Sequence, residues 1–271
     1  MRRILAAALA ATVLAAMPAP AMADPRISPA MEAALSQANR ADDHARDAFR
    51  HPAQTLAFFG VEPGMTVVDY MPAGGWYTRV LVPYLGKNGR YIGLMPDPSA
   101  AQVEGNARYF AALPAKFAEA SPKWNLSGAP VSTYVSSELP DTLQGTVDRV
   151  LIFREMHNLL RSGALRIELG RIRDLLADNG MLGIVQHRAK PWASGDYTNG
   201  GKGYLRQNDV IGLVEAHGFT LVGTSEINAN PKDTADWPGG VWELPPGLSS
   251  KNEARKAVGE SDRMTLLFRK R

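Results

Sequence analysis

The sequence contains no cysteine among its 271 residues. A chain without cysteine forms no disulfide bond, offers no thiol nucleophile, and lacks the thiolate ligands of iron–sulfur clusters and cysteine-based zinc sites. It also lacks a long run of lysine or arginine, so its charge pattern does not indicate a nucleic acid as partner. Because 45% of the residues are hydrophobic, the stability of the protein must come from an apolar core.

Several catalytic motifs are absent as well. The sequence has no G-x-S-x-G nucleophile elbow, no P-loop and no H-E-x-x-H zinc motif. A metal site built from His157, His187 and a carboxylate such as Asp69 is an alternative, but no spacing typical of metal ligands indicates it. We therefore expect no metal site.

The first 23 residues differ from the rest of the chain. MRRILAAALAATVLAAMPAPAMA begins with Arg2 and Arg3, continues with small apolar residues, and ends in Ala-Met-Ala before Asp24. This order is typical of a secretory signal peptide, either general or twin-arginine. We expect a mature chain of residues 24–271 in the periplasm or outside the cell, without stable membrane insertion. A membrane anchor is the alternative, although the run is short for a spanning helix. Removal of Arg2 and Arg3 lowers the net charge from +3 to +1.

From Val61 onward, strand patterns alternate with helical patterns. The alternation predicts a parallel, doubly wound α/β sheet that helices cover on both faces. No helical pattern separates the last two strands, so the final strand can pair antiparallel. We expect one Rossmann-like domain with a seven-stranded, mostly parallel sheet and an antiparallel last strand. The expected strands are 65–71, 89–95, 129–137, 147–156, 181–188, 219–227 and 263–270, and the expected helices are 76–86, 98–120 with a break at Pro114, 163–180 and 206–218.

Two further regions accompany this alternation. Residues 24–60 carry apolar residues at helical spacing, which predicts an N-terminal helical cap. The charged residues between positions 40 and 50 are interpreted as a solvated helix face, with a lid or substrate wall over a cleft as the alternative. Residues 228–260 are rich in proline and glycine and predict a long irregular insert. Charged residues at 260–263 predict an ion-pair network before the last strand.

The turn after the first strand is the first place to expect a ligand, because open α/β sheets bind ligands at the carboxyl ends of their strands. It reads DYMPAGGWYT from position 69 to 78. Gly74 and Gly75 allow close backbone approach and positive φ angles, and Ala73 is small enough for close approach. Trp76 and Tyr77 can stack on a flat ligand or belong to the core. We expect one of them in each role.

This stretch resembles the class I S-adenosylmethionine-dependent methyltransferases, whose first strand ends in an acidic residue followed by G-x-G-x-G. On that pattern Asp69 takes the acidic place. Met71, Ala73 and Gly75 take the three glycine places, so a single glycine remains in register. The VEPGMTVVD run-up, the order of strands and the LLADNGMLGIVQH segment extend the resemblance over residues 55–271. The resemblance implies S-adenosylmethionine as cofactor, bound by residues that include Asp69, Ala73, Gly74, Gly75 and Trp76.

A closer similarity is to a family of exported bacterial proteins that are predicted methyltransferases. The shared stretches are RHP, FFGVEPGM, GGWYT, MHN, HR and GESDRMTLLFRK. In methyltransferases an acidic residue usually ends the second strand and holds the ribose hydroxyls. Here Met95 occupies that place, and Asp97 follows between two prolines. Asp97 either binds the ribose from the loop or serves only as a turn residue.

Polar side chains follow the two central strands that come next. His157 and Asn158 follow the fourth expected strand, and His187 and Arg188 end the fifth. A histidine at such a place can act as a general base, and an arginine can bind a carboxylate or phosphate as a planar fork. Tyr204 ends a glycine-rich segment that we expect to cover the cleft. We predict these five residues as catalytic, with histidines that merely line the sheet edge as the alternative.

Three hypotheses for function follow. The first is methyl transfer from S-adenosylmethionine to a small-molecule acceptor, with His157 or His187 as base. The second is an exported, non-catalytic ligand-binding protein on a methyltransferase scaffold. The third is a histidine-dependent enzyme of another class. If Asp97 faces the cleft, the first gains support; if a side chain fills the space over Gly74 and Gly75, the others gain.

Overall fold

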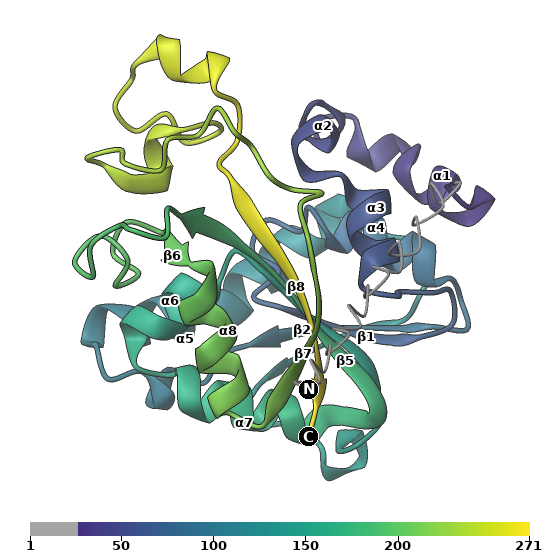
Figure 1. The fold of residues 1–271 in the computed structure, drawn as a ribbon. Coiled ribbons are helices and arrows are strands. Elements are labelled where there is room, and N and C mark those ends of the chain that lie inside the picture. Colours follow the sequence, from purple (N-terminus) through teal and green to yellow (C-terminus); the bar gives the residue numbers. More distant parts are fainter. Residues whose placement is uncertain (1–26) are drawn as a thin grey trace, which may run out of the picture.

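The computed structural model describes residues 27–271, so the predicted signal peptide at 1–23 lies outside the described residues. A mixed sheet runs through the molecule in the order β3-β2-β1-β4-β5-β8-β7, and the short β6 pairs with the end of β5 (Figure 1). All neighbours pair parallel except β8, which is antiparallel to both β5 and β7. The strands are β1 Thr66–Tyr70, β2 Arg90–Met95, β3 Val131–Val135, β4 Val147–Phe153, β5 Leu176–Ala189, β6 Leu205–Arg206, β7 Phe219–Ser225 and β8 Arg263–Lys270. The predicted fold is therefore confirmed, with β6 as an addition.

Helices cover the two faces of this sheet. Helices α1–α4 lie together on one side, and α7 and α8 lie on the other (Figure 1). Consecutive residues of β1 point to these opposite sides, because Asp69 reaches the Tyr91 hydroxyl beside α4 whereas Tyr70 donates to Glu168 of α7. The helices are α1 Pro29–Leu35, α2 Asp47–Arg50, α3 Pro52–Phe58, α4 Thr78–Leu85, α5 Glu104–Ala120, α6 Met156–Ser162, α7 Leu165–Leu175 and α8 Gln207–Ala216.

The centre of the sheet is dry, as a doubly wound fold requires. The side chains of Val67, Val150 and Ile184 are fully buried, and they lie on three neighbouring strands. Such near-continuous apolar runs are typical of parallel strands covered on both faces. The parallel pairing of β1 to β5 brings their carboxyl ends to one edge of the sheet, and the candidate site lies there.

Several predicted element bounds differ from the structure, and two of the differences have a clear physical cause. Helix α5 runs through Pro114 without a break, because its buried stripe at Phe110, Leu113 and Phe117 holds the helix on the sheet despite one lost backbone hydrogen bond. The helix expected over 163–180 ends at Leu175, and the chain from Leu176 is already extended. A Cβ at Gly180 would lie 2.7 Å from the Val147 carbonyl oxygen, so this first part of β5 passes directly against β4.

The charged N-terminal segment is not a solvated helix face. Arg40, Asp43 and Arg50 are 0%, 7% and 1% exposed, respectively. Arg40 pairs with Asp47, and Arg79 of α4 pairs with Asp43. The alternative, a wall over a cleft, describes the observed placement. Helical periodicity could not separate the two interpretations, because the partners of Asp43 and Arg50 lie elsewhere in the chain.

The insert at 228–260 has a small apolar cluster of its own. Tyr204, Trp237 and Leu244 are buried within it, and the Tyr204 hydroxyl donates to Asp233. The segment contains two 3₁₀ turns, Gly240–Glu243 and Glu253–Ala257. It projects beyond the carboxyl edge of the sheet (Figure 1). Among residues 27–271, no helix is long and apolar enough to cross a membrane.

Candidate active site

Two adjacent cavities open at the carboxyl edge of the sheet. The first, the loop cavity, measures about 160 Å³, and the second, the histidine cavity, about 370 Å³. Ala73, Arg154 and Glu155 belong to the walls of both. The loop cavity is lined by Asp43, Arg46, Arg50, Asp69, Met71, Pro72, Ala73, Gly74, Trp76, Tyr77, Arg79, Phe153, Arg154 and Glu155, and the histidine cavity by Ala73, Tyr109, Arg154, Glu155, His157, Asn158, Arg161, His187 and Trp242.

The β1–α4 loop adopts a backbone that glycine favours, although two of its residues are not glycine. The φ angles of Met71, Ala73 and Gly75 are +54°, +49° and +72°. These are the three positions that correspond to glycines in the methyltransferase pattern. Left-handed conformations of non-glycine residues cost of order 1 kcal/mol or more each, and they concentrate at functional sites. The loop therefore holds a glycine-like backbone at two positions that are not glycine.

The two glycines of the loop have different surroundings. A side chain at Gly74 would meet nothing within 4 Å, so this residue borders open space. A Cβ at Gly75 would lie 2.5 Å from the ring of Trp124. Trp124 itself packs edge-on against Phe117. Position 75 therefore requires glycine, because the ring of Trp124 leaves no room for a Cβ atom there.

Asp69, the penultimate residue of β1, carries a buried carboxyl group. Its Oδ2 accepts a hydrogen bond of 2.9 Å from the Tyr91 hydroxyl. Burial raises the pKa of Asp69 to about 7, against the lowering effect of the hydrogen bond from Tyr91. Asp69 belongs to the wall of the loop cavity. It can therefore present either a neutral or an ionised carboxyl group there near pH 7.

Asp97 lies outside both cavities and acts in a turn. Its Oδ1 accepts hydrogen bonds from the backbone and hydroxyl of Ser99, and its Oδ2 lies 3.0 Å from the guanidinium of Arg171. Arg171 also pairs with the buried Glu168. The turn role weighed from the sequence is thus observed, whereas the ribose role of Asp97 remains a prediction.

The two histidines lie side by side. The ring centroids of His157 and His187 are 5.8 Å apart, and both residues line the histidine cavity. Burial lowers the pKa of His157 to about 4 and that of His187 well below its usual value. The Nδ1 atom of His187 lies 2.6 Å from the Ser261 hydroxyl. Both rings are therefore neutral at pH 7, and each can accept a proton only weakly.

Glu155 is a site residue that the sequence reasoning missed. It borders both cavities, and burial raises its pKa to about 7, against the lowering effect of the Asn158 amide. The amide nitrogen of Asn158 donates to Glu155 at 2.5 Å. A carboxyl group with such a pKa is suited to accept a proton near neutral pH. The sequence feature that could have identified Glu155 is its position two residues after the end of β4, at the carboxyl edge of the sheet.

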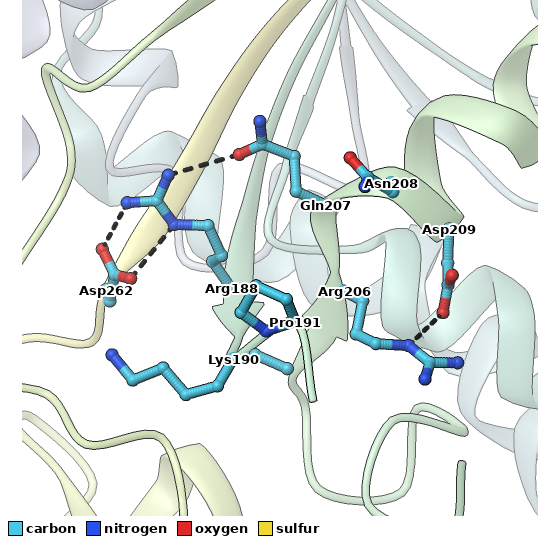
Figure 2. Close-up of a pocket in the computed structure, with 9 residues that line it drawn as sticks. Arg188, Lys190, Pro191, Arg206, Gln207, Asn208, Asp209 and Asp262 are labelled. Atoms are coloured by element: carbon cyan, nitrogen blue, oxygen red, sulfur yellow. Dashed lines mark hydrogen bonds and ion pairs between the residues drawn. The ribbon is translucent and has the colours of Figure 1, made fainter. Parts of the chain in front are cut away.

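Arg188 and Tyr204 lie away from both cavities. Arg188 is clamped by Asp262 and also by Glu226. Figure 2 shows the pocket of about 590 Å³ beside it, whose wall also carries Gln207 and the Arg206–Asp209 ion pair. The Arg188 fork is therefore already occupied by carboxylates of the protein. The catalytic roles predicted for Arg188 and Tyr204 remain predictions that this placement does not favour.

The segment predicted as a flexible cover does not line the cleft. Neither cavity has a residue of 189–204 in its wall, whereas Trp242 of the insert lies over His157 at 6.1 Å between ring centroids. A Cβ at Gly200 would lie 2.6 Å from the His157 carbonyl oxygen, so the segment packs behind this residue instead.

Trp76 and Tyr77 serve both the core and the cavity wall. Each is 7% exposed, and each borders the loop cavity. The ring of Tyr77 stacks on Phe153 with 3.5 Å between centroids, and the ring of Trp76 meets Tyr77 edge-on. Both residues therefore belong to the core and to the cavity wall, and which of them stacks on a ligand stays a prediction.

Arginines from distant parts of the chain form the remaining wall. Arg46 and Arg50 come from the N-terminal segment, and Arg154 follows β4. Glu260, 5% exposed, pairs with Arg46, Arg50 and Arg263, so the predicted ion-pair network is confirmed. Although burial raises the pKa of Glu260, these arginines lower it to about 2 overall. Within residues 27–271, no group of three or more histidine or acidic side chains could hold a metal ion.

This arrangement is the Rossmann-like fold of the class I S-adenosylmethionine-dependent methyltransferases. By sequence, the chain matches no protein-family model and no curated protein. It is similar in structure to an S-adenosylmethionine-dependent methyltransferase from Aquifex aeolicus, with a TM-score of 0.51 and 19% identity over 69% of this chain and 89% of the other. It is also similar to the [4+2]-cyclase SpnF, with a TM-score of 0.56 and 14% identity over 87% and 84%. Such low identities establish the fold alone.

Proposed function

We propose that this protein binds S-adenosylmethionine over the β1–α4 loop and transfers its methyl group to a small molecule. The observation that carries the proposal is the left-handed backbone of Met71, Ala73 and Gly75, in a loop whose Met71 lines the loop cavity and whose Ala73 lines both cavities. Two non-glycine residues hold a conformation that costs free energy. Backbone strain of this kind concentrates at functional sites, and this tendency supports a ligand at the loop.

The chain fits this cofactor in part. Gly74 borders open space, so the backbone of the loop can lie against a ligand. Asp97 does not extend the fit, because its carboxylate is already held by Ser99 and Arg171. When bound, the cofactor supplies an electrophilic methyl group. The residues of the chain would orient the acceptor, shield it from water and take up its proton.

Glu155 and His157 are the two candidates for this proton. Glu155 has the more suitable pKa, about 7, and it lies between the two cavities. His157, with a pKa of about 4, is available as a neutral ring but is the weaker base. We therefore favour Glu155 as base and His157 as a group that positions the acceptor, in place of the histidine base expected from the sequence.

The proposal is tested by product formation. The protein is incubated with S-adenosylmethionine and a panel of small acceptors, and release of S-adenosylhomocysteine is followed by mass spectrometry. Release that depends on an acceptor, and that falls at least about 100-fold in Glu155→Gln, supports the proposal. Release equal to that without protein contradicts it.

A second function, ligand binding without turnover, is favoured by specific observations. The ring of Trp124 covers Gly75, and the loop cavity of about 160 Å³ is smaller than the roughly 300–1,000 Å³ of usual ligand pockets. This function predicts saturable binding without formation of S-adenosylhomocysteine. The histidine-dependent reaction of another class is supported less well, because neither histidine has a pKa near 7.

We also propose that the protein works outside the cytoplasm, after removal of residues 1–23. The basic start, the apolar run and the Ala-Met-Ala site support this location. Mass spectrometry of the protein from a periplasmic fraction should give a chain that begins at Asp24. Recovery of the chain only from the cytoplasm, with Met1 retained, would contradict export.

A further inference from the structure

We propose that the loop cavity binds the carboxylate of a small organic anion through Arg46, Arg50 and Arg154. The inference does not depend on methyl transfer. It rests on unpaired donors, on the balance of charge around the cavity, and on the shape of its wall.

Several hydrogen-bond donors at this cavity have no partner. Within the part of the chain that the structure describes, both Nη atoms of Arg50, the Nη2 of Arg46 and the indole nitrogen of Trp76 are buried without a hydrogen bond. Arg50 is 1% exposed. A buried donor without a partner costs about 1–3 kcal/mol, and more when the group is charged. All three residues line the loop cavity, so an anion there can satisfy these donors.

The charges around the cavity are out of balance. Glu260 is the carboxylate shared by Arg46, Arg50 and Arg263, and Arg154 lies close enough to lower its pKa further. Burial lowers the pKa of Arg50 well below its usual value, and the neighbouring Arg154 adds to this effect. Three guanidinium groups thus share the carboxylate of Glu260, whereas Asp69 and Glu155 in the same wall are only partly ionised at pH 7, because burial raises the pKa of each to about 7. A second carboxylate in the cavity would relieve their repulsion.

The wall of the cavity favours a carboxylate over phosphate. Guanidinium groups bind planar carboxylates as a fork. Arg50 donates to both oxygens of Glu260 from its Nε alone, so its two Nη atoms remain for another carboxylate. Asp69 and Glu155 also border the cavity and would repel a doubly charged phosphate more than a single carboxylate. The stacked rings of Tyr77 and Phe153 supply an apolar surface for the rest of the ligand.

The carboxylate can belong to a separate small molecule or to the amino-acid end of S-adenosylmethionine. One control ligand distinguishes these two sources. 5′-Methylthioadenosine keeps the nucleoside of S-adenosylmethionine but lacks its carboxylate. We therefore titrate the protein by calorimetry with benzoate, succinate, inorganic phosphate, S-adenosylmethionine and 5′-methylthioadenosine. The indole N–H resonance of Trp76 is followed in parallel, because it reports on this cavity.

The proposal predicts saturable binding of a carboxylate that shifts the Trp76 resonance. Arg46→Gln and Arg154→Gln should each weaken this binding at least tenfold, or about 1.4 kcal/mol. Arg50→Lys keeps a charge at the buried position but loses the fork, and it should weaken binding as well. The control Arg108→Gln removes an exposed arginine of α5 and should leave binding unchanged.

The outcomes separate this inference from the proposed function. Binding of benzoate or succinate without any binding of S-adenosylmethionine supports the carboxylate site and contradicts the cofactor. Arginine-dependent binding of S-adenosylmethionine, but not of 5′-methylthioadenosine, assigns the carboxylate to the cofactor. Equal binding of all carboxylates by Arg46→Gln and Arg154→Gln, or preference for phosphate, overturns the inference. So does the absence of carboxylate binding at about 10 mM ligand.

Discussion

Glu155 is the single residue on which the chemistry depends most. Because its pKa is raised to about 7, the carboxyl group of Glu155 becomes ionised, and thus able to act as a base, only as the pH rises through neutrality. His157, with a pKa of about 4, would already be unprotonated throughout that range. The pH dependence of any activity therefore distinguishes the two bases.

With Glu155 as base, kcat/KM should rise with pH through an apparent pKa near 7. Glu155→Gln should lower kcat/KM by roughly 10²- to 10⁴-fold and remove this rise. The matched control Glu119→Gln changes an exposed acid of α5 and should leave the profile unchanged. A wild-type rate that is flat from pH 6 to pH 8, with a rise only near pH 4, would assign the role to His157 instead.

Gly75 offers a second test at the same scale. Gly75→Ala places a Cβ 2.5 Å from the Trp124 ring at a φ of +72°. We expect a loss of about 2 kcal/mol or more in the free energy of unfolding, measured in urea. Gly74→Ala meets no atom within 4 Å and should change the stability by less than about 0.5 kcal/mol. Equal effects of the two substitutions would show that Trp124 does not pack on Gly75.

At the scale of the element, the β1–α4 loop combines strain with exposure. Ala73 is exposed and has a φ of +49°. Ala73→Gly should raise the free energy of unfolding by roughly 0.5–1 kcal/mol, because relief of the left-handed strain exceeds the added freedom of the unfolded chain. Ala111→Gly, at an exposed position inside α5, should lower it by about 1 kcal/mol. A loss of stability in Ala73→Gly would contradict the strain in the loop.

The elements also show how far sequence reasoning reaches. Periodicity and composition predicted the strands, their mostly parallel sheet and the antiparallel β8, since burial on both faces leaves a clear apolar pattern in each strand. They also placed His157 and His187 at neighbouring strand ends, where the structure brings the rings together. Periodicity failed where distant contacts decide: at Pro114, at Leu176, and in the wall built by Arg46 and Arg50.

At the scale of the whole molecule, Glu260 ties the N-terminal segment to the start of β8. It is 5% exposed, and it pairs with Arg46, Arg50 and Arg263. Its folded-state pKa, about 2, is below the ordinary value of 4.5. The stability that it contributes is therefore fully present above about pH 4.5 and is lost as the pH falls toward 2.

Glu260→Gln removes the charge that holds these arginines. We expect a loss of about 3–5 kcal/mol in the free energy of unfolding at pH 7, because buried guanidinium groups remain without their carboxylate. The difference between wild type and variant should shrink on acidification below pH 4.5. Urea unfolding at several pH values measures both. A variant as stable as the wild type at pH 7 would show that Glu260 does not stabilise the contact between the N-terminal segment and β8.

The central claim is that the β1–α4 loop holds a cofactor, and calorimetric titration with S-adenosylmethionine and S-adenosylhomocysteine tests it most directly. Gly74→Arg fills the open space at the loop without meeting a neighbour at Cβ, and Gly105→Arg does the same on the exposed surface of α5. The account predicts saturable binding to wild type and to Gly105→Arg, and no binding to Gly74→Arg. No binding to the wild type at millimolar ligand, or undiminished binding to Gly74→Arg, would contradict it.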